Sequence, residues 1–157
     1  MKYFEDFRVG EEHTASRDYR VREEEIVEIA SRFDPQPFHI DPVAAADSIF
    51  GSLVASSVHL FAIAVSFSPY LGERTAAVSA LGFDRIRMLA PARPGDRLSL
   101  RCETLGARRS KSRPDCGVIE SRSELYNQDG ETVMTYENAF LVQCRDALEE
   151  SGSTENT

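Results

Sequence analysis

The sequence is poor in cysteine and has no paired cysteine motif. Its three cysteines, Cys102, Cys116 and Cys144, are odd in number and far apart, and no two of them form a Cys-x-x-Cys pair. Zinc sites and thiol redox motifs depend on such pairs, so the sequence predicts neither a metal site nor a redox site. Isolated cysteines of this kind are typical of small buried or strand residues in a reducing compartment.

Long apolar stretches are also missing. The chain begins MKYFED, without the apolar run of a signal peptide. It has no stretch of about 18 apolar residues, the length that a membrane-spanning helix needs. We therefore expect no membrane span, and we predict a cytoplasmic protein.

An excess of positive charge is absent as well. The formal net charge is −8 at pH 7, which argues against nucleic acid as a partner. Segment 82–113 is an exception, because its basic residues outnumber its acidic ones: Arg85, Arg87, Arg93, Arg97, Arg101, Arg108, Arg109, Lys111 and Arg113 against Asp84, Asp96 and Glu103. An ordinary solvated strand face is the first interpretation of this segment. A patch that meets the phosphates of a nucleotide carrier is the more specific alternative.

The length of 157 residues is that of one globular domain able to bury a core. We assign residues 1–147 to this domain. The last ten residues, LEESGSTENT, offer almost nothing to bury. Residues 148–157 are therefore expected to form a mobile tail.

Three helical segments are predicted in the first half of the chain. Residues 22–32 place apolar side chains at intervals of three and four, the spacing of one buried helix face. A short helix is predicted over 42–48. The third segment, 58–67, is apolar nearly all round, and such a helix is normally enclosed by other structure. Ser56 or Ser57 can cap its start.

The second half of the chain has the pattern of strands. A weak first strand over 13–19 is followed after the helices by four stronger ones, over 78–89, 97–104, 116–126 and 132–144. A break in alternation between Phe83 and Ile86 predicts a β-bulge. The residues NQDG at 127–130 predict a hairpin turn. Helices followed by long antiparallel strands indicate an α+β domain.

The stretch 33–41, FDPQPFHID, is the strongest indication of function. Asp34 and His39 stand five residues apart, with two prolines restricting the backbone between them. This pattern predicts an extended strut from Asp34 to His39 instead of a helical turn. Asp41, followed by proline, is a helix start signal, so His39 is expected just outside a helix N-terminus.

An aspartate and a histidine held in this way can exchange protons with a substrate. The plainer alternative is a structural hydrogen bond between the two side chains. Two further histidines are present. His59, within the apolar helix, is interpreted as a core residue, and His13 has no partner that the sequence identifies.

Residues 34–42, DPQPFHIDP, resemble the signature of the MaoC-like family, the (R)-specific enoyl-CoA hydratases and dehydratases of the hot-dog fold. The family pattern is Asp-x-Asn-Pro-x-His followed by Asp-Pro or a similar pair, and Gln36 here replaces the usual Asn. The residues PARPGD at 91–96 are similar to the family's Ala-Pro-Val-Arg-Pro-Gly-Asp. The resemblance covers residues 3–145.

The resemblance implies a hot-dog fold, in which a curved antiparallel sheet wraps around the central apolar helix. It implies that Asp34 and His39 are catalytic and hold the water that adds to a 2-enoyl thioester, without a cofactor or a metal. A backbone N–H at the start of the central helix would hold the enolate oxygen. The partners implied are an acyl-CoA thioester and further copies of the chain, in a homodimer or a higher homo-oligomer. The predicted substrate-binding residues are Gln36, Ser56, Ser57 and Val58.

The start of the central helix departs from the family pattern. Ala55-Ser56-Ser57 stands where the family usually has Ala-His-Gly, so a side chain occupies space where the thioester should lie. Two alternatives to a hydratase or dehydratase therefore remain: an acyl-CoA thioesterase of the same fold, and a non-catalytic acyl-CoA-binding subunit. His39 favours the hydratase over the thioesterase, because hot-dog thioesterases generally lack a histidine at this position.

Overall fold

The computed structural model describes residues 1–145, so the predicted tail at 148–157 lies outside the described residues. The helices are α1 (Glu23–Phe33), α2 (Pro37–Ile40), α3 (Pro42–Ala46) and α4 (Ser57–Ser66), with 3-10 turns η1 (Phe4–Asp6) and η2 (Ser68–Tyr70). The strands are β1 (Glu12–Thr14), β2 (Tyr19–Arg20), β3 (Ala77–Met88), β4 (Arg97–Arg109), β5 (Cys116–Tyr126) and β6 (Thr132–Gln143). None of the helices in this part of the chain is long and apolar enough to span a bilayer.

The strands form one antiparallel sheet in the order β1-β4-β5-β6-β3, and β2 also pairs with β4. The predicted hairpin at 127–130 is confirmed. The side-chain oxygen of Asn127 accepts hydrogen bonds from the N–H groups of Asp129 and Glu131, each at 3.0 Å. Gly130 supplies the positive φ of +75° that closes this turn.

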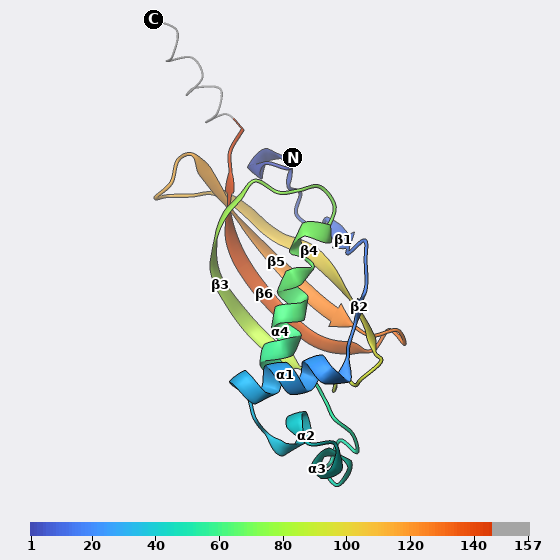
Figure 1. Cartoon of the computed structure of the whole chain (residues 1–157). Coiled ribbons are helices and arrows are strands. Elements are labelled where there is room, and N and C mark those ends of the chain that lie inside the picture. Colours follow the sequence, from blue (N-terminus) through green and yellow to red (C-terminus); the bar gives the residue numbers. More distant parts are fainter. Residues whose placement is uncertain (146–157) are drawn as a thin grey trace, which may run out of the picture.

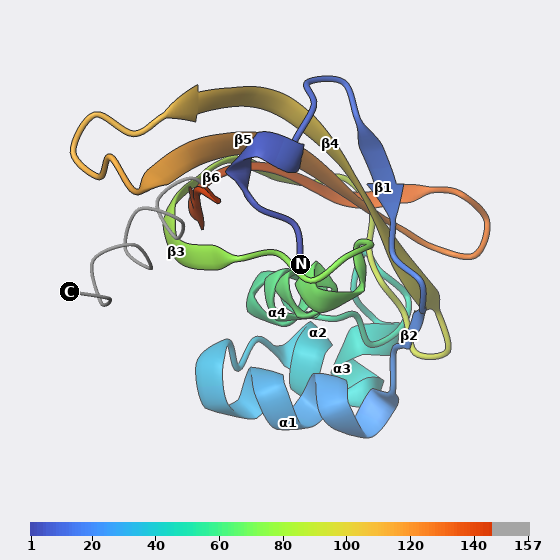
Figure 2. The same ribbon diagram turned by 90° about the horizontal axis from the view of Figure 1, so that it is seen from above.

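The curved sheet wraps around α4, as Figures 1 and 2 show. Leu60, Ile63 and Ala64 of α4, and Phe67 directly after it, are buried in the main core, together with apolar residues from β4, β5 and β6. The α1 helix covers the other side of α4 (Figure 2). This arrangement explains why α4 is apolar nearly all round, and it confirms the predicted α+β class and hot-dog fold.

Strand β3 lies at an edge of the sheet and carries the predicted bulge. Its register against β6 shifts between Asp84 and Arg87, and Arg85 has a φ of +50°. The strand and the residue after it expose a row of large apolar side chains: Val78, Leu81, Phe83, Ile86, Met88 and Leu89. An exposed apolar edge of this kind is a surface for pairing with another chain.

Two details of the secondary structure before residue 41 differ from the prediction. The expected extended strut is wrong. Gln36 is extended at φ −72° and ψ 143°, but its N–H donates to the Asp34 carbonyl at 2.8 Å in a tight turn, and Pro37–Ile40 forms the single helical turn α2. Proline is tolerated at the first helical position, because its missing N–H would have no partner there. His39 therefore lies within a helical turn, and Asp41 caps the next helix by accepting from Val43 N–H at 2.9 Å. The weak strand predicted over 13–19 is divided into β1 and β2.

His59 is confirmed as a buried core residue, and its environment is poor for an imidazole. It is 1% exposed, and neither ring nitrogen has a hydrogen-bond partner. Its Nε2 atom lies 3.8 Å from a carboxylate oxygen of Glu25, beyond hydrogen-bond distance. Burial lowers the pKa of His59, and the nearby Glu25 offsets this only in part.

We expect His59→Leu to raise the free energy of unfolding by about 1–3 kcal/mol, the cost of a buried polar group without partners. The variant should also tolerate acid better. Because the folded protein holds His59 neutral, protonation below a pH of about 6.5 favours the unfolded wild-type chain. Denaturant titrations at about pH 7.5 and pH 5.5 measure both effects. If His59→Leu is less stable than the wild type at both pH values, the ring nitrogens of His59 have hydrogen-bond partners in solution.

Candidate active site

The structure brings Asp34 and His39 together at the end of α1. Asp34 is the residue that follows this helix, and its N–H donates to the carbonyl of Ala30 at 2.8 Å. His39 comes from α2. Its Nε2 atom lies 3.6 Å from Oδ2 of Asp34. The two side chains therefore face the same point, as their spacing in the sequence predicts.

A backbone carbonyl fixes the orientation of the imidazole. His39 Nδ1 lies 2.6 Å from the carbonyl oxygen of Val54. A carbonyl can only accept a hydrogen bond, so Nδ1 carries the proton and donates it. In neutral His39 the Nε2 lone pair is then directed toward Asp34. His39 is 7% exposed and the Asp34 side chain 27%, so the pair is largely shielded from solvent.

The separation of the pair suits a bridging water better than a direct contact. At 3.6 Å, Nε2 and Oδ2 are too far apart for a hydrogen bond. One water oxygen can nevertheless lie about 2.8 Å from both atoms. Both atoms accept hydrogen bonds, so such a water would direct its two O–H groups at them and its lone pairs elsewhere. This arrangement can orient and activate a water molecule.

The pair opens onto a cavity of about 380 Å³ at the N-terminal end of α4. This volume is within the range of small-molecule sites, and most of the wall is apolar. Besides Asp34, His39 and Ser57, the lining residues are Phe38, Phe50, Val54, Ala55, Leu60, Met88, Leu89, Ala90 and Pro91. The cavity can therefore take a small apolar group with its reactive end at the Asp34–His39 pair.

Only Ser57, among the four residues predicted to bind substrate, lines this cavity. Ser56 is completely buried, and its hydroxyl caps α4 by accepting from His59 N–H at 3.3 Å. Gln36 is exposed at the start of α2. Val58 is 47% exposed, because it follows Ser57 by about 100° around the helix and faces away. Gln36, Ser56 and Val58 therefore do not line this cavity, and their contact with a substrate stays a prediction.

Arg93 is a positioning residue that the sequence interpretation missed. Its Nη1 donates to the carbonyl of Phe50 at 2.6 Å and to Oγ of Ser52 at 2.5 Å. The neighbouring Ala92 carbonyl accepts from Ala55 N–H at 2.9 Å. The turn at 91–96 therefore holds the segment that leads into α4 and forms a wall of the cavity. The arginine within the PARPGD motif was the signal for this role.

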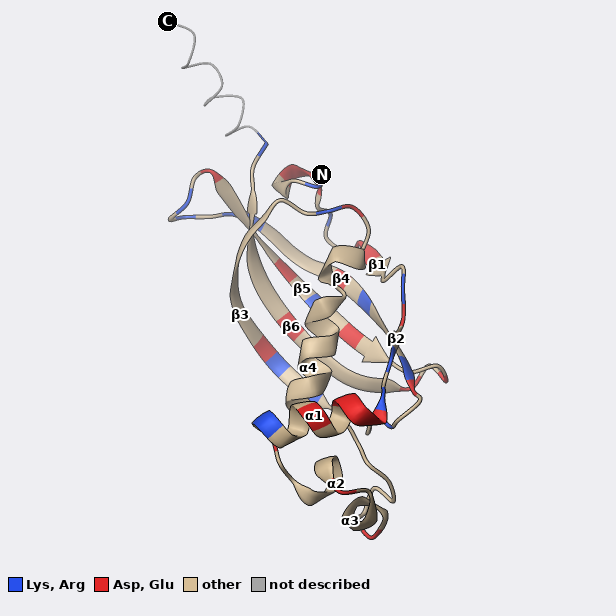
Figure 3. Ribbon diagram, viewed as in Figure 1, with Lys and Arg blue, Asp and Glu red and all other residues tan. Residues whose placement is uncertain are grey.

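The basic segment 82–113 has the character of an ordinary strand face. Five of its basic residues form ion pairs with carboxylates: Arg85 with Glu137, Arg97 with Asp18, Arg101 with Glu124, Arg109 with Glu5, and Arg113 with Asp115. Figure 3 shows the two signs interspersed along the strands. These pairs favour the interpretation of the segment as a solvated strand face over its interpretation as a phosphate-binding patch. Over residues 1–145, no group of three or more His, Cys, Asp or Glu side chains could hold a metal.

Comparison with known proteins places the chain in a family. The sequence model described as the MaoC like domain matches residues 6–124, well over half of the chain. The chain therefore belongs to the MaoC-like domain family. It is 23% identical to the uncharacterised protein YdeM of Bacillus subtilis over 142 residues, which cover 88% of this chain and 97% of YdeM.

Two solved structures show the extent of the similarity. A MaoC-like dehydratase from Rhodospirillum rubrum superposes with a TM-score of 0.85 at 34% identity, covering 92% of this chain and 99% of that one. The R-hydratase PhaJ1 from Pseudomonas aeruginosa gives a TM-score of 0.72 at 20% identity, covering 91% of this chain and 86% of that one. At 20% identity the second comparison establishes a shared fold.

Proposed function

We propose that the protein is a hydro-lyase that adds water to a 2-enoyl-CoA thioester, or removes it from the corresponding 3-hydroxyacyl-CoA. The observation that carries this proposal is the Asp34–His39 pair, whose facing acceptor atoms are 3.6 Å apart at the wall of an apolar cavity. The similarity to a MaoC-like dehydratase at 34% identity supports it. No cofactor enters the proposed reaction.

In the hydration direction, the pair would hold one water and direct its oxygen at the β-carbon of the enoyl group. As the C–O bond forms, one proton of the water passes to Asp34, which transfers it to Nε2 of His39, and His39 delivers it to the α-carbon. The water thereby supplies OH to one carbon and H to the other, and the pair returns to its starting state. Positioned proton transfer of this kind contributes about 10²–10⁴-fold to a rate.

The negative charge that develops on the thioester oxygen needs a hydrogen-bond donor, and the first turn of α4 provides backbone N–H groups for this role. The N–H groups of this turn have no acceptor within the helix, and the helix dipole favours negative charge there. The hydroxyl of Ser56 already accepts from His59 N–H. The N–H groups of Ser57 and Val58 are therefore the proposed donors, and Ser57 lines the cavity. Backbone donors of this type are worth about 10²–10³-fold in turnover.

Crotonyl-CoA tests the proposed function. Hydration should remove the absorbance of the conjugated thioester without releasing free thiol. Release of thiol would instead identify the alternative thioesterase. Binding with neither change would identify the alternative non-catalytic subunit.

We further propose that two copies of the chain join at β3. The support is the row of exposed apolar side chains on this edge strand. Leu81→Lys, which places a charge at the centre of the row, is expected to convert dimer to monomer in sedimentation experiments. Ile49→Lys is the matched control, because Ile49 is 96% exposed and lies outside β3. A Leu81→Lys variant that stays dimeric would exclude this interface.

The proposed location is the cytoplasm. Cys102, Cys116 and Cys144 are free thiols, and two of them are buried. Free thiols are typical of a reducing compartment.

A further inference from the structure

The cavity at the start of α4 presents the side chain of one hydroxyl residue in a wall that is otherwise apolar apart from the acid–histidine pair. Over the described residues, its polar lining side chains are those of Asp34, His39 and Ser57. The proposed hydration uses the first two to hold the water. A hydroxyl that faced only the apolar part of a ligand would lose its water without compensation. The Ser57 side chain therefore favours a ligand with a polar atom at this point of the wall.

The hydroxyl of Ser57 is not used by the helix that begins with it. Ser57 is the first residue of α4, but the cap is the neighbouring Ser56, whose hydroxyl accepts from His59 N–H at 3.3 Å. Among residues 1–145, none forms a hydrogen bond with the hydroxyl of Ser57. The residue is exposed in the chain without a ligand. Its O–H group is therefore available to a molecule that enters the cavity.

The hydrogen bond that orients the catalytic imidazole also explains why this hydroxyl stays available. A serine in a helix often donates to the carbonyl three or four residues earlier. Ser66, at the other end of α4, does so and donates to the carbonyl of Ile63 at 2.6 Å. For Ser57 the carbonyl three residues earlier is that of Val54, which already accepts from Nδ1 of His39 at 2.6 Å. The imidazole thus occupies a carbonyl that the serine would otherwise use.

Val54 also ties the position of Ser57 to that of the catalytic pair. Its N–H donates to the carbonyl of Phe38 at 3.3 Å, and its carbonyl accepts from His39. These two bonds join α2 to the segment that leads into α4, and Ser57 follows three residues later. A donor that is held in place before the reaction needs little reorganisation when charge develops beside it. The arrangement therefore suits a group that acts on the same substrate as His39.

We propose that the hydroxyl of Ser57 is a catalytic group that donates a hydrogen bond to the thioester oxygen, beside the backbone N–H groups of Ser57 and Val58. This inference rests on the proposed hydration. As the water adds to the β-carbon, the electron pair of the C=C bond moves toward the thioester, and negative charge collects on its oxygen. The hydroxyl donates to that oxygen and keeps its own proton. When His39 protonates the α-carbon, the carbonyl forms again and the hydrogen bond weakens.

Ser57→Ala tests the hydroxyl, because it removes the O–H group and keeps the backbone N–H. We expect kcat for crotonyl-CoA hydration to fall at least about tenfold while KM changes less than about threefold, since the bond is strong only when the oxygen carries charge. Ser57→Thr keeps a hydroxyl and should be at least about tenfold faster than Ser57→Ala. Alanine is a good helix former and Ser56 still caps α4, so the fold should be retained.

Ser66→Ala is the matched control, because it makes the same chemical change in the same helix outside the cavity. Its rate of hydration should equal that of the wild type. A Ser57→Ala enzyme with the kcat of the wild type would overturn the proposal. A Ser57→Thr enzyme as slow as Ser57→Ala would overturn it as well, because the loss would then come from packing and not from the missing donor.

Acetoacetyl-CoA tests the same hydrogen bond without turnover. This 3-oxoacyl thioester ionises to an enolate, which carries negative charge on the thioester oxygen and is followed by its ultraviolet absorbance. In Ser57→Ala, the pH at which half of the bound ligand is enolate should rise by at least about one unit, which corresponds to a tenfold loss of enolate stabilisation. Equal values in the variant and the wild type would overturn the proposal. A wild type that fails to hydrate crotonyl-CoA would instead contradict the proposed function, and the enolate measurement would still decide whether the hydroxyl is a donor.

Discussion

Replacing Asp34 by Asn or His39 by Ala is expected to lower the rate of crotonyl-CoA hydration by about 10²–10⁴-fold in each case. Asparagine keeps the shape of Asp34 but cannot accept the proton of the water. Alanine removes the Nε2 acceptor that lies 3.6 Å from the carboxylate. Steady-state rates measured by loss of the enoyl absorbance give the size of each effect.

The pair acts on one water, so its two substitutions should not be additive. The double variant is expected to be about as slow as the slower single variant. Asp41→Asn is the matched control, since it makes the same chemical change outside the cavity. Asparagine caps helices about as well as aspartate, so α3 should be retained and the rate should stay close to that of the wild type. Single variants with normal rates would remove Asp34 and His39 from the mechanism.

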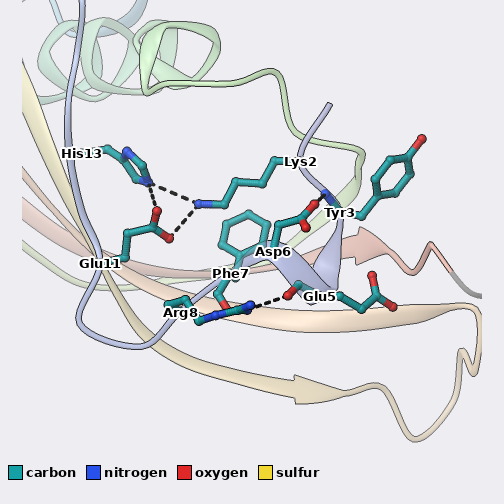
Figure 4. A network of polar contacts seen from close by, with 8 residues as sticks. All are labelled: Lys2, Tyr3, Glu5, Asp6, Phe7, Arg8, Glu11 and His13. Atoms are coloured by element: carbon teal, nitrogen blue, oxygen red, sulfur yellow. Dashed lines mark hydrogen bonds and ion pairs between the residues drawn. The ribbon is translucent and has the colours of Figure 1, made fainter.

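Gly117→Ala is expected to cost about 1–3 kcal/mol of unfolding free energy, the usual penalty for overpacking. A Cβ at Gly117 in β5 would lie 1.9 Å from Cδ2 of Phe4 and 2.3 Å from two further ring atoms. The ring of Phe4 must therefore leave its place on the sheet. Because Phe4 belongs to the N-terminal segment that also holds Lys2 (Figure 4), this segment should be loosened as well. Denaturant unfolding measures the cost, and hydrogen exchange at residues 2–7 measures the loosening.

A double-mutant cycle separates this steric effect from a general weakness of the strand. In a Phe4→Ala background, Gly117→Ala should have little further effect, because the clashing ring has been removed. Gly82→Ala in β3 is the control, since a Cβ there meets no atom within 4 Å. An equal loss for Gly117→Ala with and without Phe4 would mean that the ring contact is not the cause.

The sequence predicted the elements whose patterns are strong and local. The strand over 116–126 and the helix around 58–66 lie where alternation and continuous apolarity place them. The turn α2 was missed because a single turn has no periodicity to detect. The last residues of β4, up to Arg109, were missed for a different reason. Polar residues such as Arg108 and Arg109 show no alternation, and they are strand residues because β5 pairs with them.

The candidate site, too, could be predicted from the sequence only in part. Asp34 and His39 could be identified because both belong to one short segment whose prolines restrict its path. The rest of the cavity could not, since its wall joins Phe50 and Leu60 to residues 88–91, which are distant in the sequence. The motif at 91–96 predicted a turn but did not reveal that Arg93 supports the segment leading into α4.

By itself, the sequence determined the α+β class, the enclosed central helix and the pairing of an acid with a histidine. These features follow from spacing along the chain, which sets backbone geometry and the face of each element. Only the tertiary structure decided which way His39 presents its nitrogens and that Ser57, unlike Gln36, Ser56 and Val58, faces the cavity. The physical reason is that side-chain direction and enclosure arise from packing between segments that no local pattern connects.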